Sequence, residues 1–359
     1  MLEWSLKHHD GTSEAKPMSE ADKQWLEGAM KEAVVDLEDR LKDLKTSLER
    51  GVAAQQAGGE AGGEAGGEAG GEAGGEAGGE AAAGASPASS PGEGVPGVAA
   101  MEAALEDLME LVEIVDFARD LQAIGGLPVL KDLLRSSEPG LRSRAAEVAG
   151  TCVQNCATVQ ESFYEGGVLE ALLPLAEDPV AAVRAKGLFA LSCQFRGHLR
   201  SLVWLRVHGF RATLVRRLAD PDVRVRRKAV QMIAAWIRAL ARDRRELADA
   251  GALDALLPSL ADADDATREA AFALAADFAA DGAVLRAMQA DHRWRDAVRG
   301  ATVRLDAVSK ADWDAVKEEA EAVLALSRRL ASPPPPPERP PTAAQAKAGA
   351  IVAIPPKSD

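Results

Sequence analysis

A repeat of about 42 residues is the feature of this sequence that most constrains its fold. Four stretches can be aligned, and they read IGGLPVLKDLL, EGGVLEALLPL, VHGFRATLVRRL and DAGALDALLPSL. Their aligned glycines are separated by 41, 42 and 42 residues and are Gly126, Gly167, Gly209 and Gly251. Four copies in register indicate that the chain builds the same structural unit four times.

Each unit contains two apolar runs separated by a turn. The turns read SSEPG, EDPV, DPDV and DADD, and the second run opens with a basic residue at Arg144, Arg184, Arg226 and Arg268. A glycine turn, a helix, a proline or aspartate turn and a long helix, at this length, are typical of armadillo repeats. One unit cannot bury its apolar face alone, so neighbouring units stack. We therefore predict an all-α fold, a right-handed armadillo-repeat solenoid with a concave groove.

The rest of the chain divides into segments of different composition. We predict a flexible segment over 1–18, an amphipathic helix over 19–50, a linker over 51–98, the armadillo-repeat core over 99–330 and a tail over 331–359. The linker holds six AGGE repeats and the tail is rich in proline. Neither can bury enough apolar surface to offset the entropy of ordering, so both are predicted to be disordered.

Two leucine-rich stripes flank the linker. In both, the apolar residues follow one another at the spacings of three and four that place them on one helix face. The first stripe comprises Leu26, Met30, Val34, Leu37, Leu41, Leu44 and Leu48 and is predicted to end at Gly51; the second comprises Met101, Leu105, Leu108, Val112 and Val115. Three arrangements fit this pattern: the two helices pack on each other, they cap the solenoid, or they form a coiled coil between copies of the chain. The spacing does not decide among them, so the oligomeric state also stays open.

Charge is distributed unevenly along the chain. The net charge is −14, and most of the acidic excess lies in the N-terminal arm and linker. Residues 193–245, in contrast, carry 14 Lys and Arg against three Asp. Such a stretch suits an acidic protein partner or a phosphate backbone. The acidic arm and linker would compete with nucleic acid for this surface, so we expect a protein partner and no nucleic acid.

Residue patterns for catalysis, metal binding and membrane insertion are missing. The three cysteines, Cys152, Cys156 and Cys193, form no CxxC motif, and adjacent His8 and His9 lack further ligands. No HExxH, GxSxG or P-loop is present. No apolar run reaches the roughly 20 residues of a membrane span, and the N-terminus lacks the apolar core of a signal peptide. We expect no enzyme activity, cofactor, metal or membrane contact, and a cytoplasmic location with the nucleus as the alternative.

Several segments resemble one family of armadillo proteins. GTCVQNCATVQ (150–160), GLFALSCQFRG (187–197) and LRVHGF (205–210) are similar to the armadillo-type nucleotide-exchange factors of the 70-kDa heat-shock chaperone, the Hsp70-binding protein family. LEWSLKHHDGT and MSEADKQWLEGAM resemble the opening of its plant and fungal members. VEIVDFARDLQAIGGL (112–127) is similar to a family segment usually written with IDNANDL. Nuclear-import armadillo proteins are a poorer match, because their groove needs several Asn and this chain contains only Asn155.

The resemblance implies a function. The concave side of the solenoid would embrace one lobe of the nucleotide-binding domain of cytosolic heat-shock protein 70 and distort it, so that ADP leaves. The N-terminal segment, with Leu2, Trp4 and Leu6, would occupy the substrate-binding domain and keep released client from rebinding. Alternatively, these three side chains pack on the solenoid. The alternative function is a generic armadillo adaptor without nucleotide exchange.

The resemblance also indicates contact residues. In VDFARDL, Asp116 and Ala118 match the family pattern, whereas Phe117 and Arg119 replace its two Asn. Lys228 falls at the basic position with which the family binds the chaperone. The predicted contact set in the core is Asp116, Ala118, Asn155, Arg196, Arg224, Arg226, Arg227 and Lys228. The alternative for the basic members is an ordinary solvated helix face.

Overall fold

The structure is a computed structural model that describes residues 19–61 and 95–333. The described residues form α-helices and two short 3-10 helices, without a strand among them, which confirms the predicted all-α class. The chain divides into two compact units, Met1–Cys152 and Val153–Asp359. The predicted segment 1–18 and most of the predicted linker and tail lie outside the described residues.

The first unit is built around one long helix. Its elements are α2 (Glu20–Ala61), α3 (Val98–Val112), α4 (Val115–Ala123), α5 (Gly126–Leu134) and α6 (Pro139–Val153). Helix α2 packs on α3 and α5. The two leucine stripes therefore pack on each other, with Leu41 and Leu48 of α2 and Met101 and Leu105 of α3 all buried.

Helix α2 does not end at Gly51 as the sequence suggests. It continues to Ala61, so residues 51–61, which we assigned to the linker, are helical. Gly51 is buried, and a Cβ at this position would collide with the thioether of Met101. The glycine serves the close approach of two helices, and this packing overrides its weak helix propensity.

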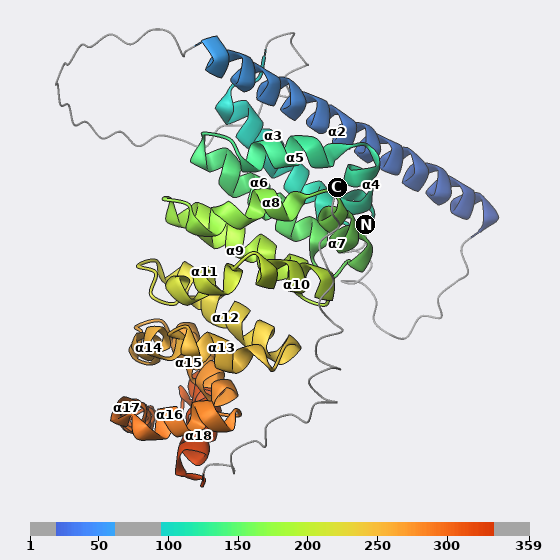
Figure 1. Ribbon diagram of the computed structural model, residues 1–359. Helices are drawn as coiled ribbons and strands as arrows, with labels where there is room; N and C mark the ends of the chain where they lie inside the picture. Colours follow the sequence, from blue (N-terminus) through green and yellow to red (C-terminus); the bar gives the residue numbers. More distant parts are fainter. Residues whose placement is uncertain (1–18, 62–94, 334–359) are drawn as a thin grey trace, which may run out of the picture. The chain divides into compact units, whose positions relative to one another are not determined.

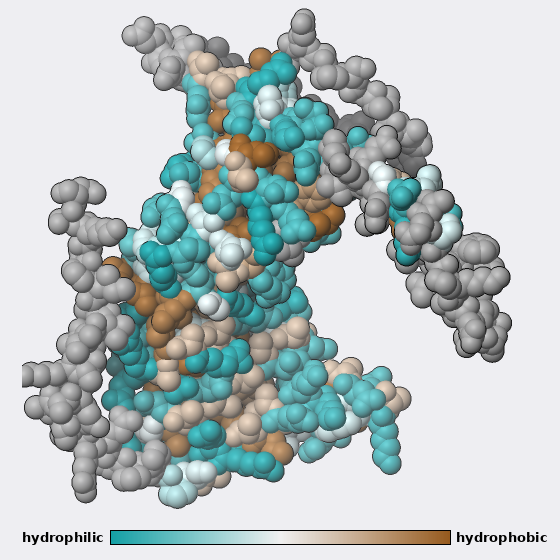
Figure 2. Space-filling model, turned by 90° about the vertical axis from the view of Figure 1, so that its right-hand side faces the viewer, coloured by the Kyte–Doolittle hydropathy of each residue, from teal (hydrophilic) through white to brown (hydrophobic). Residues whose placement is uncertain are grey.

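The second unit is a series of helical repeats that follow one another along the stack (Figure 1). Its elements are α7 (Ala157–Glu165), α8 (Val168–Leu172), η1 (Leu173–Glu177), α9 (Ala181–Phe195), α10 (Leu199–Val207), α11 (Phe210–Arg217), α12 (Val223–Ala239), α13 (Asp243–Asp249), α14 (Ala252–Leu256), η2 (Leu257–Ala261), α15 (Asp265–Phe278), α16 (Gly282–Ala290), α17 (His292–Asp306) and α18 (Trp313–Ala331). The third helices pack side by side, α9 on α12, α12 on α15 and α15 on α18. Their large apolar side chains, such as Trp236 and Phe278, are fully buried. On the face in Figure 2, hydrophilic residues predominate and hydrophobic ones gather in separate patches.

Left-handed glycines mark the start of the second helix in each repeat. Their φ angles are 77°, 68°, 76° and 92° at Gly125, Gly167, Gly209 and Gly251, which are spaced by 42 residues throughout. This corrects our alignment of the first repeat on Gly126. Gly126 is instead the first residue of α5, and a Cβ there would collide with Leu121. Only glycine reaches such φ angles without steric cost, so the turn requires glycine at this position of each repeat.

An arginine in each repeat clamps the preceding turn. Its Nη1 donates to two consecutive backbone carbonyls at 2.8–3.2 Å, those of Ser136 and Ser137, Asp178 and Pro179, Asp220 and Pro221, or Asp262 and Ala263. The arginines are Arg142, Arg184, Arg226 and Arg268, again 42 residues apart. Arg142, not the predicted Arg144, thus belongs to the first repeat. Arg144 pairs with Glu106 of α3.

In the second unit, the same arginines join successive repeats. Arg184 donates from Nε and Nη2 to both carboxylate oxygens of Asp220, each at 2.8 Å. Arg226 binds Asp262, and Arg268 binds Glu319 of α18. We call these three pairs the arginine–carboxylate ladder. Burial alone would raise the pKa of Asp220, but hydrogen bonds from Arg184 and the Asp222 amide hold it below its ordinary value.

The ladder predicts a stability loss that depends on pH. Asp220 is fully buried at its side chain, so Asp220→Asn should leave Arg184 without its carboxylate and lower the free energy of unfolding by about 3–5 kcal/mol. The lowered pKa means that the carboxylate stabilises the fold above the ordinary Asp pKa of about 3.9 and loses this effect as pH falls through the folded-state pKa. The difference between the two proteins should therefore shrink below about pH 4. Urea unfolding at pH 7 and pH 3 measures it.

A matched control is Asp296→Asn, which removes one partner of an exposed ion pair with Arg299. Such pairs contribute about 0–1 kcal/mol. If Asp220→Asn lowers the free energy of unfolding at pH 7 no more than Asp296→Asn does, the ladder does not stabilise the stack.

Candidate functional site

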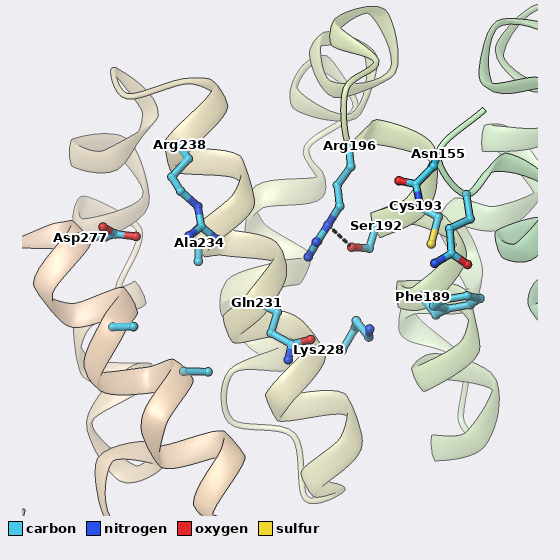
Figure 3. A pocket seen from close by; sticks show the side chains of 13 residues that line it. Asn155, Phe189, Ser192, Cys193, Arg196, Lys228, Gln231, Ala234, Arg238 and Asp277 are labelled. Carbon is cyan, nitrogen blue, oxygen red and sulfur yellow. Dashed lines mark hydrogen bonds between the residues drawn. The ribbon is translucent and has the colours of Figure 1, made fainter. Parts of the chain in front are cut away.

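A groove of about 580 Å³ crosses the third helices α9, α12 and α15 of the second unit (Figure 3). One end is formed by Gln154 and Asn155, in the loop that follows α6. Further along, the lining comes from the three parallel helices and ends at Asp277 of α15. No described residue outside the second unit lines this groove.

The 42-residue repeat explains why these positions come together. Equivalent residues of successive repeats form columns across the groove. One column comprises Phe189, Gln231 and Ala273, a second comprises Gln154, Arg196 and Arg238, and a third pairs Lys228 with Ala270. Along each helix the lining residues recur at spacings of three and four, as one helix face requires. The groove is therefore one face repeated, with different side chains at each step.

The charge of the lining changes sign along the groove. Arg196 follows α9, Lys228 and Arg238 lie on α12, and Asp277 lies on α15. The small side chains of Ala234, Ala270 and Ala273 leave the floor open between them. The α9–α12 half is thus complementary to an acidic surface, and the α15 end is complementary to a basic one.

Lys228 lies at the centre of the positive half. Its Nζ is 5.5 Å from the centre of the Phe189 ring, and Figure 3 shows its side chain between Gln231 and Phe189. Burial lowers the pKa of Lys228, and the positive charges of Arg196 and Arg227 lower it further. A cation held over an aromatic ring and partly removed from water is a strong contact point for a carboxylate.

Cys193 lies beside Lys228 but is not activated. Burial raises the pKa of its thiol, although the charges of Lys228 and Arg196 act in the opposite direction. A thiol with a raised pKa is a poor nucleophile. Within residues 19–61 and 95–333, no group of three His, Cys, Asp or Glu is placed to hold a metal ion, and no helix is long and apolar enough to cross a bilayer.

The groove brings together three of the predicted contact residues. Asn155, Arg196 and Lys228 all line it. Asn155 is exposed and has a φ of 57°, the one left-handed residue other than glycine in the described part of the chain. Arg196 is held by a hydrogen bond of 3.1 Å from its Nε to the hydroxyl of Ser192. Their contact with a partner remains a prediction.

The other basic residues near Lys228 have partners within the protein. Arg226 belongs to the arginine–carboxylate ladder, and Arg227 pairs with Asp264. Arg224 is 61% exposed and pairs with Asp222, the residue that caps the start of α12. Hydrogen bonds from Arg224 lower the pKa of Asp222 to about 2. None of the three arginines lines the groove.

The remaining predicted residues lie in the first unit or outside the described residues. Asp116 is exposed on α4 and pairs with Arg119. Ala118 is buried and only 2% exposed, so it offers almost no surface for contact with a partner. Leu2, Trp4 and Leu6 fall in the part of the chain that the structure does not describe.

Sequence reasoning missed several lining residues, above all Phe189, Gln231, Arg238 and Asp277. The signal was available in the repeat, because Phe189 and Gln231, like Arg196 and Arg238, are separated by 42 residues. Applying the 42-residue spacing to every position of the third helices, and not only to the glycines, identifies these lining residues.

Comparison with known proteins supports the resemblance. Residues 117–199 match the family model described as the SIL1/FES1/HPBP1 C-terminal domain. Hsp70-binding protein 1 of Rattus norvegicus is 42% identical over 112 residues, 30% of this chain and 31% of that protein. The Hsp70 nucleotide exchange factor FES1 of Coccidioides immitis is 35% identical over 100 residues, 28% of this chain and 47% of that protein. The chain thus spans about a third to a half of these relatives, and the predicted family resemblance is confirmed over this segment.

Solved structures support the fold. The designed armadillo repeat protein YIII(Dq)4CqI is 22% identical, with a TM-score of 0.51, over 64% of this chain and 95% of its own. Another computationally designed armadillo repeat protein is 20% identical, with a TM-score of 0.51, over 63% of this chain and 94% of its own. The predicted armadillo-repeat fold is confirmed.

Proposed function

We propose that this protein is a co-chaperone that binds the nucleotide-binding domain of a cytosolic 70-kDa heat-shock protein and promotes the release of ADP. One observation carries the proposal. The segment that matches the exchange-factor family, residues 117–199, includes α9 and the groove residues Asn155, Phe189 and Arg196. The proposed location is the cytoplasm, with the nucleus as the alternative.

The proposed mechanism is differential binding and requires no covalent chemistry. If the groove binds the open form of the nucleotide cleft more tightly than the closed form, it shifts the population towards the open form. ADP, which is held by the closed form, then dissociates faster. We therefore propose no catalytic role, in agreement with a Cys193 thiol whose pKa is raised.

The positive half of the groove is the proposed contact surface. Lys228 and Arg196 project into it and are not bound to a carboxylate among the described residues, unlike Arg226 and Arg227. Phe189 provides an apolar surface beside them. An acidic surface on the nucleotide-binding domain with an apolar residue next to it would fit this arrangement.

We also propose that residues 1–12 act on the chaperone's substrate-binding domain. Their sequence, with Leu2, Trp4 and Leu6, has the apolar centre and basic flank of a peptide that a chaperone groove accepts. Because the segment belongs to the same chain, its binding becomes intramolecular once the groove is occupied. Effective concentrations for such tethered contacts reach about millimolar.

The proposed contact predicts the effect of reversing one charge. Lys228→Glu should reduce the acceleration of ADP release at least about tenfold, because charge pairs buried at an interface contribute more than about 1.4 kcal/mol. The measurement is stopped-flow release of a fluorescent ADP analogue from a cytosolic 70-kDa heat-shock protein. Circular dichroism checks that the variant is folded.

Arg224→Glu is the matched control. Arg224 is one helical turn from Lys228 and more exposed, but it does not line the groove. The Arg224→Glu variant should accelerate ADP release to within about twofold of the unaltered protein, as expected when a screened surface charge is changed. Equal loss in both variants would mean that overall charge, and not the groove, determines binding. No acceleration by the unaltered protein would favour the adaptor alternative.

Removal of the N-terminal segment separates the two proposed activities. A chain lacking residues 2–12 should accelerate ADP release normally, since the groove is intact, but should release bound client peptide more slowly. The measurement is fluorescence anisotropy of a labelled peptide leaving the chaperone. Unchanged peptide release would exclude a role for Leu2, Trp4 and Leu6 and would leave the exchange proposal unaffected.

A further inference from the structure

Ser332 ends the last helix of the second unit in an exposed, extended conformation. It is the C-cap of α18, with φ −72° and ψ 146°, and its hydroxyl donates a hydrogen bond of 2.7 Å to the carbonyl of Arg328. Pro333 follows and is also exposed. The chain thus changes at Ser332 from helix to the extended form that proline favours.

Two arginines precede Ser332 in the last turn of α18. Arg328 and Arg329 are exposed, and their guanidinium groups make no hydrogen bond or ion pair with any described residue. On the neighbouring helix α17, by contrast, Arg293 and Arg304 are both paired with carboxylates. Positive charge close to Ser332 is therefore left without a counter-charge in this part of the structure.

Helix α17 adds two more arginines to the surroundings of Ser332. A hollow of about 240 Å³ is lined by Arg295 and Arg299 of α17 and by Leu330 and Ala331, which directly precede Ser332. Gln289 connects the two sides. Its side-chain amide donates to the main-chain carbonyls of Leu330 and Ser332 at 3.2 and 2.8 Å. The main-chain carbonyl of Gln289 accepts a hydrogen bond of 2.6 Å from the Arg295 guanidinium.

We propose that Ser332 is a phosphorylation site for a serine kinase that recognises arginine at −3 and proline at +1, here Arg329 and Pro333. A kinase pocket with a carboxylate binds guanidinium at −3. Proline at +1 suits a kinase that needs no backbone N–H there. Because the last turn of a helix frays, Arg329 can follow Ser332 into an extended binding groove.

The reaction is an ordinary phosphoryl transfer from ATP. The Ser332 hydroxyl oxygen forms a bond to the γ-phosphorus and its proton passes to the catalytic base of the kinase. The bond between the γ-phosphorus and the bridging oxygen breaks, and ADP leaves with the electron pair. The product carries a phosphate that is largely dianionic at pH 7.

The arginines around Ser332 would hold this phosphate. A dianion at the C-terminal end of α18 is disfavoured by the helix dipole. Arg295 and Arg329 offset this effect, because guanidinium groups donate short, charge-assisted hydrogen bonds to phosphate oxygens. Arg329 thus both selects the site for the kinase and helps to stabilise the phosphorylated product.

The first test is phosphorylation of the full chain by a recombinant kinase of this specificity with Mg-ATP, mapped by mass spectrometry. Phosphate should appear on Ser332 and be absent from Ser332→Ala. Arg329→Gln should lower the rate at least about tenfold, as expected for the loss of one buried charge-assisted pair. The control Arg328→Gln removes an equally unpaired arginine at −4 and should change the rate less than about twofold.

The linker supplies an internal comparison. Ser86 and Ser90 also precede a proline, but alanine and proline stand at their −3 positions, Ala83 and Pro87. They should be modified much more slowly than Ser332. No phosphate on Ser332, or equal rates for the two arginine variants, would overturn the proposal.

The second test examines how the phosphate is held. The second pKa of an unperturbed phosphoserine is about 6. Nearby guanidinium groups favour the dianion, so phosphorus-31 NMR of the phosphorylated protein should give a pKa clearly below this value. Arg295→Gln should return it towards about 6. A pKa of about 6 in the unaltered protein would show that the arginines do not hold the phosphate.

Discussion

The bidentate pair between Arg184 and Asp220 shows the interaction on which the second unit depends. Each ladder arginine binds the turn of its own repeat and a carboxylate of the next, so it fixes the stacking of both. Buried ion pairs contribute little net stability on average, and their better-attested role is to fix one arrangement. Here that arrangement places equivalent residues of α9, α12 and α15 in columns, and these columns form the groove.

The ladder also changes how the basic stretch 193–245 is understood. Counting charges predicts a broadly positive surface, but Arg206, Arg217 and Arg226 are bound to carboxylates of their own or neighbouring repeats. Lys228, Arg196 and Arg238, in contrast, line the groove, and we propose that they are the part of the stretch that meets a partner. A stretch with a large formal excess of arginine can thus leave few of its charges unpaired, because many of them bind carboxylates within the protein.

The sequence predicted the repeat and the fold class but not the fine register. In the first repeat two adjacent glycines match the pattern, and only the backbone shows that Gly125 has the positive φ. Arg142 and Arg144 likewise both fit the sequence pattern. Only the hydrogen bond from Arg142 to the Ser136 carbonyl shows which of the two is equivalent to the arginines of the later repeats. The sequence pattern predicts a helix end at Gly51, but α2 continues beyond this residue because Gly51 packs closely on Met101. The resemblance assigns Lys228 to the contact surface, whereas its neighbour Phe189 is found only when the 42-residue period is applied to the third helices.

We propose that binding of the groove and binding of ADP oppose each other on the chaperone. Linkage requires that ADP weaken the affinity for this protein by the same factor by which this protein weakens the affinity for ADP. Isothermal titration calorimetry of the full chain against the nucleotide-binding domain, without nucleotide and saturated with ADP, measures this factor directly. We predict an affinity at least about tenfold lower with ADP, a coupling of about 1.4 kcal/mol. Equal affinities in the two states would contradict nucleotide exchange.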